Sequence, residues 1–177
     1  IRVNGTMISE QEVVAFCETI RNTKLDFKPS FFEITFVMAI RYFIEQNCDY
    51  VVLETGMGGR LDATNVVKPL ISVITNIGLD HQQYLGNTLQ DIAKEKAGII
   101  KENTPVVIGK EQEGIHTVFE DVAKSKDARI LIAQQSYTDS KLPQYQLENI
   151  NTAVATLKEL QIECSEEIIQ NSLTNLY

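Results

Sequence analysis

Two short apolar runs near the middle of the chain constrain its fold more than any other feature. Tyr50–Leu53 and Leu70–Ile74 are nearly continuous apolar stretches of strand length, and each is followed by a polar loop that begins at Glu54 or Thr75. Strands that are buried on both faces of a parallel sheet have this composition. Ligands of open α/β sheets bind beyond the carboxyl ends of such strands. We therefore expect the chemistry of this protein in these two loops.

Segments with helical periodicity alternate with the apolar runs. A hydroxyl residue followed three residues later by an acid is the spacing of a capping box, and it predicts helix starts at Ser9, Ser30 and Thr88. Gly98 is expected to end the third of these helices in a left-handed conformation. Alternating strands and helices predict an α/β fold, a mostly parallel sheet flanked by helices. Further strands are expected at 105–108 and 129–133, and further helices at 114–124, 147–160 and 166–173.

Composition and charge narrow the classes of function. The 177 residues suit one domain with a sizeable core, since 44% of them are hydrophobic. A net charge of −8 argues against a nucleic-acid surface and a basic membrane patch, and no apolar run reaches the length of a transmembrane span. The three cysteines are far apart in the sequence, which indicates reduced thiols rather than disulfides. We therefore expect a cytoplasmic protein.

Three residues of the central stretch could carry chemistry, and each also has a structural explanation. Glu54 suits a metal ion bound to nucleotide phosphates, but a carboxylate that caps a turn explains its position equally well. His81 could be a metal ligand, a general base or a hydrogen-bonded loop residue. Lys96 lies in a charged helical segment of a kind that is normally solvated. The small and apolar residues after Lys96 nevertheless favour partial burial, which requires a partner or a change of charge.

Other polar and aromatic residues have ordinary structural explanations as well. Asp62 suits an Asx turn, and Ser30 with Glu33 is explained by a helix cap. Phe32 suits either the core or stacking on a planar ligand. Asn149 suits an amide that caps a helix. A zinc hydrolase is disfavoured because a zinc site needs three or four convergent ligands, and no short-spaced pair of His, Cys or Glu supplies them.

Three motifs in order closely resemble the folylpolyglutamate synthase and dihydrofolate synthase family. They are ETGMGGRLDATN at 54–65, GLDHQQYLG at 78–86 and IAKEKAGI at 92–99. The resemblance extends to VNGTMIS near the start, to FFEIT at 31–35 and to YQLEN at 145–149, so it covers most of the chain. These enzymes belong with the Mur ligases, which form amide bonds at the expense of ATP. The resemblance implies the central, P-loop NTPase-like domain of such a ligase.

The resemblance also implies a role for each residue of the candidate site. Glu54, His81 and a carbamylated Lys96 match residues that are catalytic and hold magnesium ions. Asn149 resembles the asparagine beside the ATP base. The residues that match pterin- or folate-binding segments are Ser30, Phe31, Phe32, Glu33, Leu61, Asp62 and Ala63.

The implied reaction is the ATP-dependent addition of L-glutamate to dihydropteroate or a folate, with Mg²⁺ as cofactor and an acyl phosphate as intermediate. We expect a monomer. No GxxxxGK[ST] phosphate loop occurs in the 177 residues, and the family's smaller C-terminal domain is not represented. Residues 1–177 are therefore expected to be a partial central domain that cannot turn over alone. The alternatives are another Mur-type ligase of acids and amino acids, and a non-catalytic nucleotide-binding module.

Overall fold

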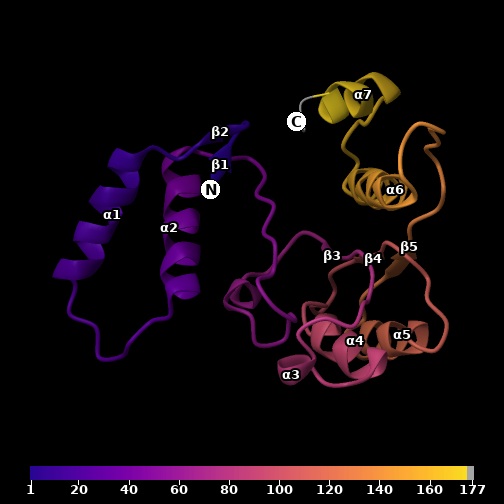
Figure 1. The fold of residues 1–177 in the computed structure, drawn as a ribbon, viewed down its shortest axis with the longest axis horizontal. Coiled ribbons are helices and arrows are strands. Elements are labelled where there is room, and N and C mark those ends of the chain that lie inside the picture. Colours follow the sequence, from indigo (N-terminus) through magenta and orange to yellow (C-terminus); the bar gives the residue numbers. More distant parts are fainter. Residues whose placement is uncertain (175–177) are drawn as a thin grey trace. The chain divides into compact units, whose positions relative to one another are not determined.

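The chain forms two compact units, which a computed structural model describes over residues 1–174 (Figure 1). The first unit comprises residues 1–56 and 62–66, and the second comprises residues 57–61 and 67–177. Residues 175–177, with which the sequence ends, lie outside the described residues. Each unit has its own secondary structure and is considered by itself below.

The first unit is a small hairpin followed by helices. Its elements are β1 (Arg2–Val3), β2 (Thr6–Met7), α1 (Glu10–Asn22), α2 (Phe31–Glu45) and the 3-10 helix η1 (Ala63–Val66). The hairpin is antiparallel and turns at Asn4 and Gly5, which both have positive φ angles. The capping boxes predicted at Ser9 and Ser30 are both confirmed, and they fix the starts of α1 and α2.

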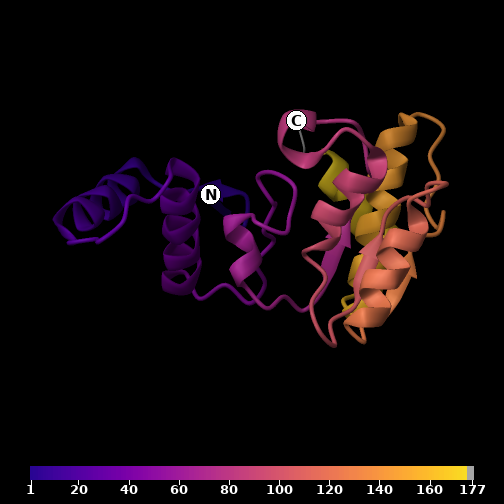
Figure 2. The ribbon, with the colours of Figure 1, turned by 90° about the horizontal axis from the view of Figure 1, so that it is seen from below.

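The second unit is an α/β layer structure. Three parallel strands, β3 (Ser72–Ile74), β4 (Val106–Ile108) and β5 (Ile130–Ile132), pair in that order. Figure 1 shows α6 on the opposite side of these strands from α4 and α5, and in Figure 2 α5 lies in front of α6. The predicted mostly parallel sheet flanked by helices is therefore confirmed. The helices of this unit are α3 (Gln82–Leu85), α4 (Leu89–Ala97), α5 (His116–Ser125), α6 (Gln144–Glu159) and α7 (Glu166–Thr174).

The core of the second unit lies between the sheet and the pair α4 and α5. All three residues of β4 are buried, as expected for the middle strand of a covered sheet. Val106 and Ile108 of β4 join buried side chains of β3, α4 and α5 in one cluster, which includes Ile92, Ala97 and Phe119. This cluster supports the end of α4, where Lys96 is located. In the described part of the chain, no helix is long and apolar enough to cross a membrane.

Two sequence expectations about secondary structure are wrong. Tyr50–Leu53 forms no strand, and its side chains are largely exposed, Val52 at 95%. An apolar run becomes a strand only where a neighbouring strand pairs with its backbone, and none of the described residues does so here. Gly98 is not left-handed, because its φ is −61°. A glycine is required there for a different reason, the close approach of another segment.

The contribution of the N-terminal cap of α4 to stability can be tested by a substitution at Thr88. The Thr88 hydroxyl accepts a hydrogen bond from the Asp91 N–H at 3.1 Å. Replacing Thr88 with alanine is expected to lower the free energy of unfolding by about 1 kcal/mol, because that N–H loses its acceptor. Chemical denaturation of the intact protein measures the change. Thr19→Ala in the middle of α1 is the matched control, since Thr19 is exposed and alanine is the better helix former. Equal losses in both variants would contradict the capping role.

Candidate functional site

Three loop segments meet at the end of α4 in the second unit. The Arg60 N–H donates a hydrogen bond to the Glu95 carbonyl at 2.9 Å. The Arg60 guanidinium also pairs with the Glu95 carboxylate, with Nη2 and Oε1 separated by 3.0 Å. The loop at residues 57–60, which belongs to the first motif, is thus tied to the helix of the third motif by both backbone and side chain.

Glycines make this approach possible. A Cβ on Gly98 would lie 2.5 Å from Arg60 Cα, and a Cβ on Gly59 would lie 2.8 Å from Ile99 Cγ2 and 3.0 Å from the Glu95 carbonyl oxygen. Gly58 has a φ of +67°, and a Cβ there would lie 2.8 Å from Leu85 Cδ2. Leu85 belongs to the second motif. Because these glycines have no side chain, segments of all three motifs can lie close together.

Lys96 lies in the last turn of α4, inside this meeting point. It is half-buried, whereas Lys94 two residues earlier is exposed, and the predicted partial burial of Lys96 is confirmed. Among the described residues of its own unit, no carboxylate lies within 4.0 Å of the Lys96 ammonium. A half-buried cation of this kind is open to chemical modification or to a ligand that carries negative charge.

His81 lies on the loop that follows β3. Its backbone is left-handed, with a φ of 50°, and it occupies the position before α3 without capping that helix through its side chain. The imidazole is about half exposed, and its Nε2 lies 3.7 Å from Asp80 Oδ2. His81 therefore presents an accessible nitrogen next to a carboxylate, at the carboxyl end of a strand of the sheet.

Glu54 lies in the first unit and is exposed. Its expected position at the end of a buried strand is wrong, because the segment before it is not a strand. Its carboxylate remains accessible on a loop that leads into the first motif. In residues 1–174, no three His, Cys, Asp or Glu side chains gather closely enough to hold a metal ion by themselves.

The residues predicted to bind a pterin or folate lie mostly in the first unit. The Asp62 carboxylate accepts hydrogen bonds from the Gly56 N–H at 2.9 Å and from the Thr64 N–H at 2.9 Å, so the predicted Asx turn is confirmed. The Phe32 ring packs against Gly56, where a Cβ would lie 2.8 Å from it. These contacts bring the loop at Asp62 and Ala63 to the start of α2.

The start of α2 combines a tight cap with exposed rings. The Glu33 carboxylate accepts a hydrogen bond from the Ser30 N–H at 2.6 Å. This bond, followed by one with the Ser30 side chain, lowers the pKa of Glu33. Phe31 is 84% exposed and Phe32 is 40% exposed, which leaves aromatic surface open beside the cap. Leu61 is also exposed, and it belongs to the second unit.

Asn149 is exposed on α6. Its neighbour Glu148 accepts a hydrogen bond from the Lys110 ammonium at 2.9 Å, and this bond lowers the pKa of Glu148. Sequence reasoning missed two backbone segments of the second unit that are held by side-chain amides. The buried Asn151 binds the backbone of Tyr137 and Leu147, and Gln112 binds the backbone of Ile77. Single amides in polar segments carry no sequence signal for such contacts.

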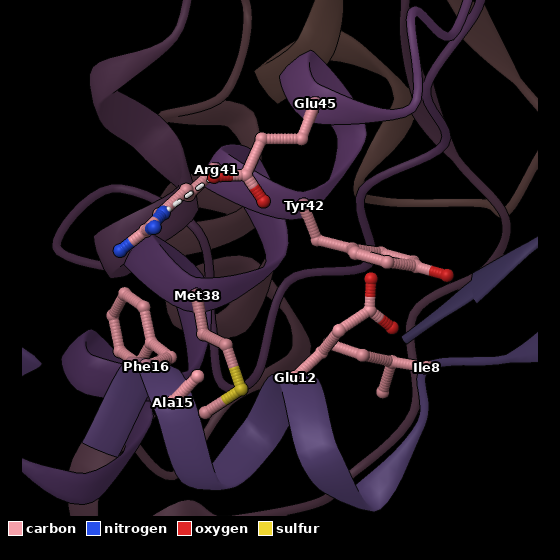
Figure 3. Close-up of a pocket in the computed structure, with 8 residues that line it drawn as sticks. All are labelled: Ile8, Glu12, Ala15, Phe16, Met38, Arg41, Tyr42 and Glu45. Atoms are coloured by element: carbon pink, nitrogen blue, oxygen red, sulfur yellow. Dashed lines mark hydrogen bonds and ion pairs between the residues drawn. The ribbon is translucent and has the colours of Figure 1, made fainter. Parts of the chain in front are cut away.

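A hollow lies between α1 and α2 of the first unit, and none of the predicted site residues lines it (Figure 3). It is open to solvent. Arg41 pairs with Glu45 at 2.7 Å and lies 5.9 Å from the centre of the Phe16 ring. Burial, followed by the charge of Glu12, raises the pKa of Tyr42. The lining residues are Ile8, Glu12, Ala15, Phe16, Met38, Arg41, Tyr42 and Glu45.

Comparison with known proteins identifies relatives over most of the chain. The family model described as the Mur ligase middle domain matches residues 8–169. A dihydrofolate synthase/folylpolyglutamate synthase of Bacillus subtilis is 49% identical over 115 residues, which are 60% of this chain and 26% of that protein.

Solved structures show the same fold. The structure of Escherichia coli FolC in complex with DHPP and ADP has a TM-score of 0.80 and 31% identity, and the match covers 95% of this chain and 44% of that one. A bifunctional folylpolyglutamate synthase/dihydrofolate synthase from Yersinia pestis, complexed with AMPPNP and a Mn ion, has a TM-score of 0.83 and 28% identity over 99% of this chain and 47% of that one. The chain thus spans about half the length, or less, of these relatives.

Proposed function

Because the chain belongs to the Mur ligase middle-domain family, we propose that it forms part of an ATP-dependent ligase that adds L-glutamate to dihydropteroate, to folates or to both. The observation that carries the proposal is the meeting of three loop motifs at the end of α4, around the half-buried Lys96. The names of the relatives described above support the substrate class.

The reaction proceeds in two steps. The terminal phosphoryl group of ATP passes to a carboxylate of the pteroate or folate, which gives an acyl phosphate and ADP. The amine of glutamate then attacks the acyl carbon, phosphate leaves, and an amide forms with release of a proton. The chief task of the protein in such a reaction is to hold the reactants in line and to balance the charge on the phosphoryl oxygens.

The proposed metal ligands are Glu54, His81 and a carbamylated Lys96. Carboxylate and carbamate oxygens and an imidazole nitrogen are donors that Mg²⁺ or Mn²⁺ accepts, so the residue types fit such an ion. The side chains of Glu54 and His81 are accessible, as binding of a metal–nucleotide complex requires. When bound, the ion neutralises charge on the transferred phosphoryl group. The Mn ion in the structure of the relative from Yersinia pestis supports a divalent ion here, for which we propose Mg²⁺.

Carbamylation of Lys96 accounts for its half-buried position, where no carboxylate among the described residues of its own unit pairs with it. The neutral amine forms a C–N bond to carbon dioxide, a proton leaves the nitrogen, and a cation is replaced by a carbamate with negative charge. The last turn of α4 favours positive charge, because the helix dipole is negative there. The carbamate is therefore stable only with another positive charge close by, which a divalent metal ion supplies.

The proposed pterin site is the aromatic and polar surface at the start of α2. The exposed rings of Phe31 and Phe32 offer stacking area to a planar heterocycle. The Asp62 carboxylate binds the N–H groups of Gly56 and Thr64, and these hydrogen bonds hold the Gly56 backbone next to the loop that contains Ala63. Ser30, Glu33 and Leu61 complete the proposed set, and we assign Asn149 on α6 to the ATP base. We also propose that the protein is a monomer and that it is located in the cytoplasm.

Coupled turnover of the intact protein tests the proposed function. Continued ADP release, beyond one ADP for each protein molecule, is expected only when ATP, Mg²⁺, glutamate and an acceptor are all present, with either dihydropteroate or tetrahydrofolate as the acceptor. Mass spectrometry of the acceptor is expected to show one added glutamyl residue for each ADP released. Folded protein that releases no ADP with either acceptor would contradict the ligase. ADP release at the same rate without acceptor would indicate an ATPase instead.

A further inference from the structure

The loop that carries His81 has one buried anchor on its β3 side. Between the end of β3 at Ile74 and His81, every residue except Ile77 is exposed, and Ile77 is only 4% exposed. The Ile77 side chain belongs to the core cluster of the second unit. On the other side of His81, the Leu85 N–H donates a hydrogen bond to the His81 carbonyl at 3.0 Å, and Leu85 packs on the same core. His81 therefore lies between two residues, Ile77 and Leu85, that are anchored in the core.

The backbone of Ile77 is held by a single side chain. Gln112 Oε1 accepts a hydrogen bond from the Ile77 N–H at 2.7 Å, and Gln112 Nε2 donates one to the Ile77 carbonyl at 2.9 Å. One amide therefore satisfies both backbone groups of a buried residue, in the way that a neighbouring strand would. A buried N–H or carbonyl that loses such a partner destabilises the local structure, because the group is left without a hydrogen bond.

Gln112 acts where regular pairing of the sheet ends. The strand register runs to Ile74 opposite Ile108, and the Gly109 N–H donates one more hydrogen bond to the Ile74 carbonyl at 2.8 Å. Beyond that point, no ladder of backbone hydrogen bonds joins the two segments in the described part of the chain, and a Cβ on Gly109 would lie 2.5 Å from the Thr75 carbonyl oxygen. The Gln112 amide continues the pairing by side chain, and so fixes the first part of the loop after β3.

We propose that Gln112 is a positioning residue for the divalent metal site, which holds the loop at residues 75–80 and through it the His81 imidazole. The proposal rests on the function proposed above, because it takes His81 as a metal ligand. Residues that orient a ligand from behind typically change metal affinity by about 10–100-fold when they are removed. Gln112 orients His81 indirectly, because it holds the backbone of the loop that carries His81.

The test measures binding and local structure rather than turnover. Mn²⁺ is titrated into the intact protein with saturating ADP, and bound ion is followed by electron paramagnetic resonance. Gln112→Ala is expected to weaken Mn²⁺ binding by about tenfold, which corresponds to the loss of one to two ordinary hydrogen bonds. Hydrogen exchange of the Ile77 amide is expected to become faster in the same variant. Gln112→Met fills nearly the same space without an amide and carries the test if the alanine variant does not fold.

Gln90→Ala is the matched control. The Gln90 amide donates one hydrogen bond to the Gly114 carbonyl at 3.2 Å from an exposed position on α4, and no hydrogen bond joins it to residues 75–81 in the described chain. Its Mn²⁺ affinity and the exchange rate of the Ile77 amide are expected to stay within about twofold of the unsubstituted protein.

His81→Ala separates failure of this inference from failure of the proposed function. If His81→Ala weakens Mn²⁺ binding while Gln112→Ala and Gln112→Met leave it unchanged, Gln112 does not position the site and only this inference is wrong. If His81→Ala itself has no effect on Mn²⁺ binding, His81 is not a ligand and both the proposed metal site and the role of Gln112 are overturned.

Discussion

Replacing Lys96 with alanine is expected to lower the rate of glutamate addition by about 10²–10³-fold, the cost of removing one charge-stabilising group from a transfer site. The reason is that Lys96 lies half-buried at the point where the three motifs meet. Its carbamate would supply oxygen atoms that alanine cannot replace. Steady-state turnover of the intact protein, with ADP release as the readout, measures the loss. A short carboxylate such as acetate is expected to restore part of the rate by occupying the vacated space.

Lys94→Ala is the control for this prediction. Lys94 is on the same helix, has the same charge and is exposed, so its removal is expected to change the rate by no more than about twofold. The unsubstituted protein is also expected to lose activity in buffer freed of carbon dioxide and to regain it when bicarbonate is added. An unchanged rate in Lys96→Ala would remove this residue from the site.

Gly98→Ala is expected to have the largest effect on stability, lowering the free energy of unfolding by about 2–4 kcal/mol. A Cβ at this position would lie 2.4 Å from Arg60 Cβ and 2.5 Å from Arg60 Cα. Cα is a backbone atom and Cβ is bonded to it, so neither can move away without the backbone of Arg60. That backbone is held on α4 by the hydrogen bond from the Arg60 N–H to the Glu95 carbonyl. Relief of the clash therefore requires separation of the loop from the helix. Chemical denaturation of the intact protein gives the change in free energy.

Gly78→Ala is the matched substitution for stability. A Cβ on Gly78 would have no atom within 4 Å, and Gly78 is not among the glycines with positive φ. The stability of this variant is expected to stay within about 0.5–1 kcal/mol of the unsubstituted protein. If Gly98→Ala were as mild as Gly78→Ala, the close packing of Arg60 on α4 would be wrong.

Local sequence signals predicted the secondary structure well where they act through the backbone. The capping boxes at Ser9 and Ser30 and the cap at Thr88 are all present, because a hydroxyl and the N–H three residues later lie within one turn of helix. The strands β4 and β5 followed from apolar runs, of which the sheet buries β4 fully and β5 partly. Tyr50–Leu53 has the same composition but no strand beside it, and composition alone cannot show whether a neighbour exists.

The candidate site was predicted only in part. Motif order pointed to Lys96 and His81, but not to the contacts that fix them. Gly98 was expected to matter for its own conformation, whereas it matters for the close approach of the Arg60 backbone, which is distant in the sequence. Gln112 gave no signal, because an amide that completes the hydrogen bonds of Ile77 is recognisable only once both segments are in place.

The exposed run Tyr50–Leu53 has a consequence for handling the protein. Short exposed segments rich in valine and aromatic residues, without proline, are the kind that stack into intermolecular sheets. Asp49 and Glu54 flank this run with negative charge. Charges at the ends of an apolar stretch oppose such stacking, in the manner of gatekeeper residues. Glu54, proposed as a metal ligand, is therefore expected to oppose aggregation of the chain as well.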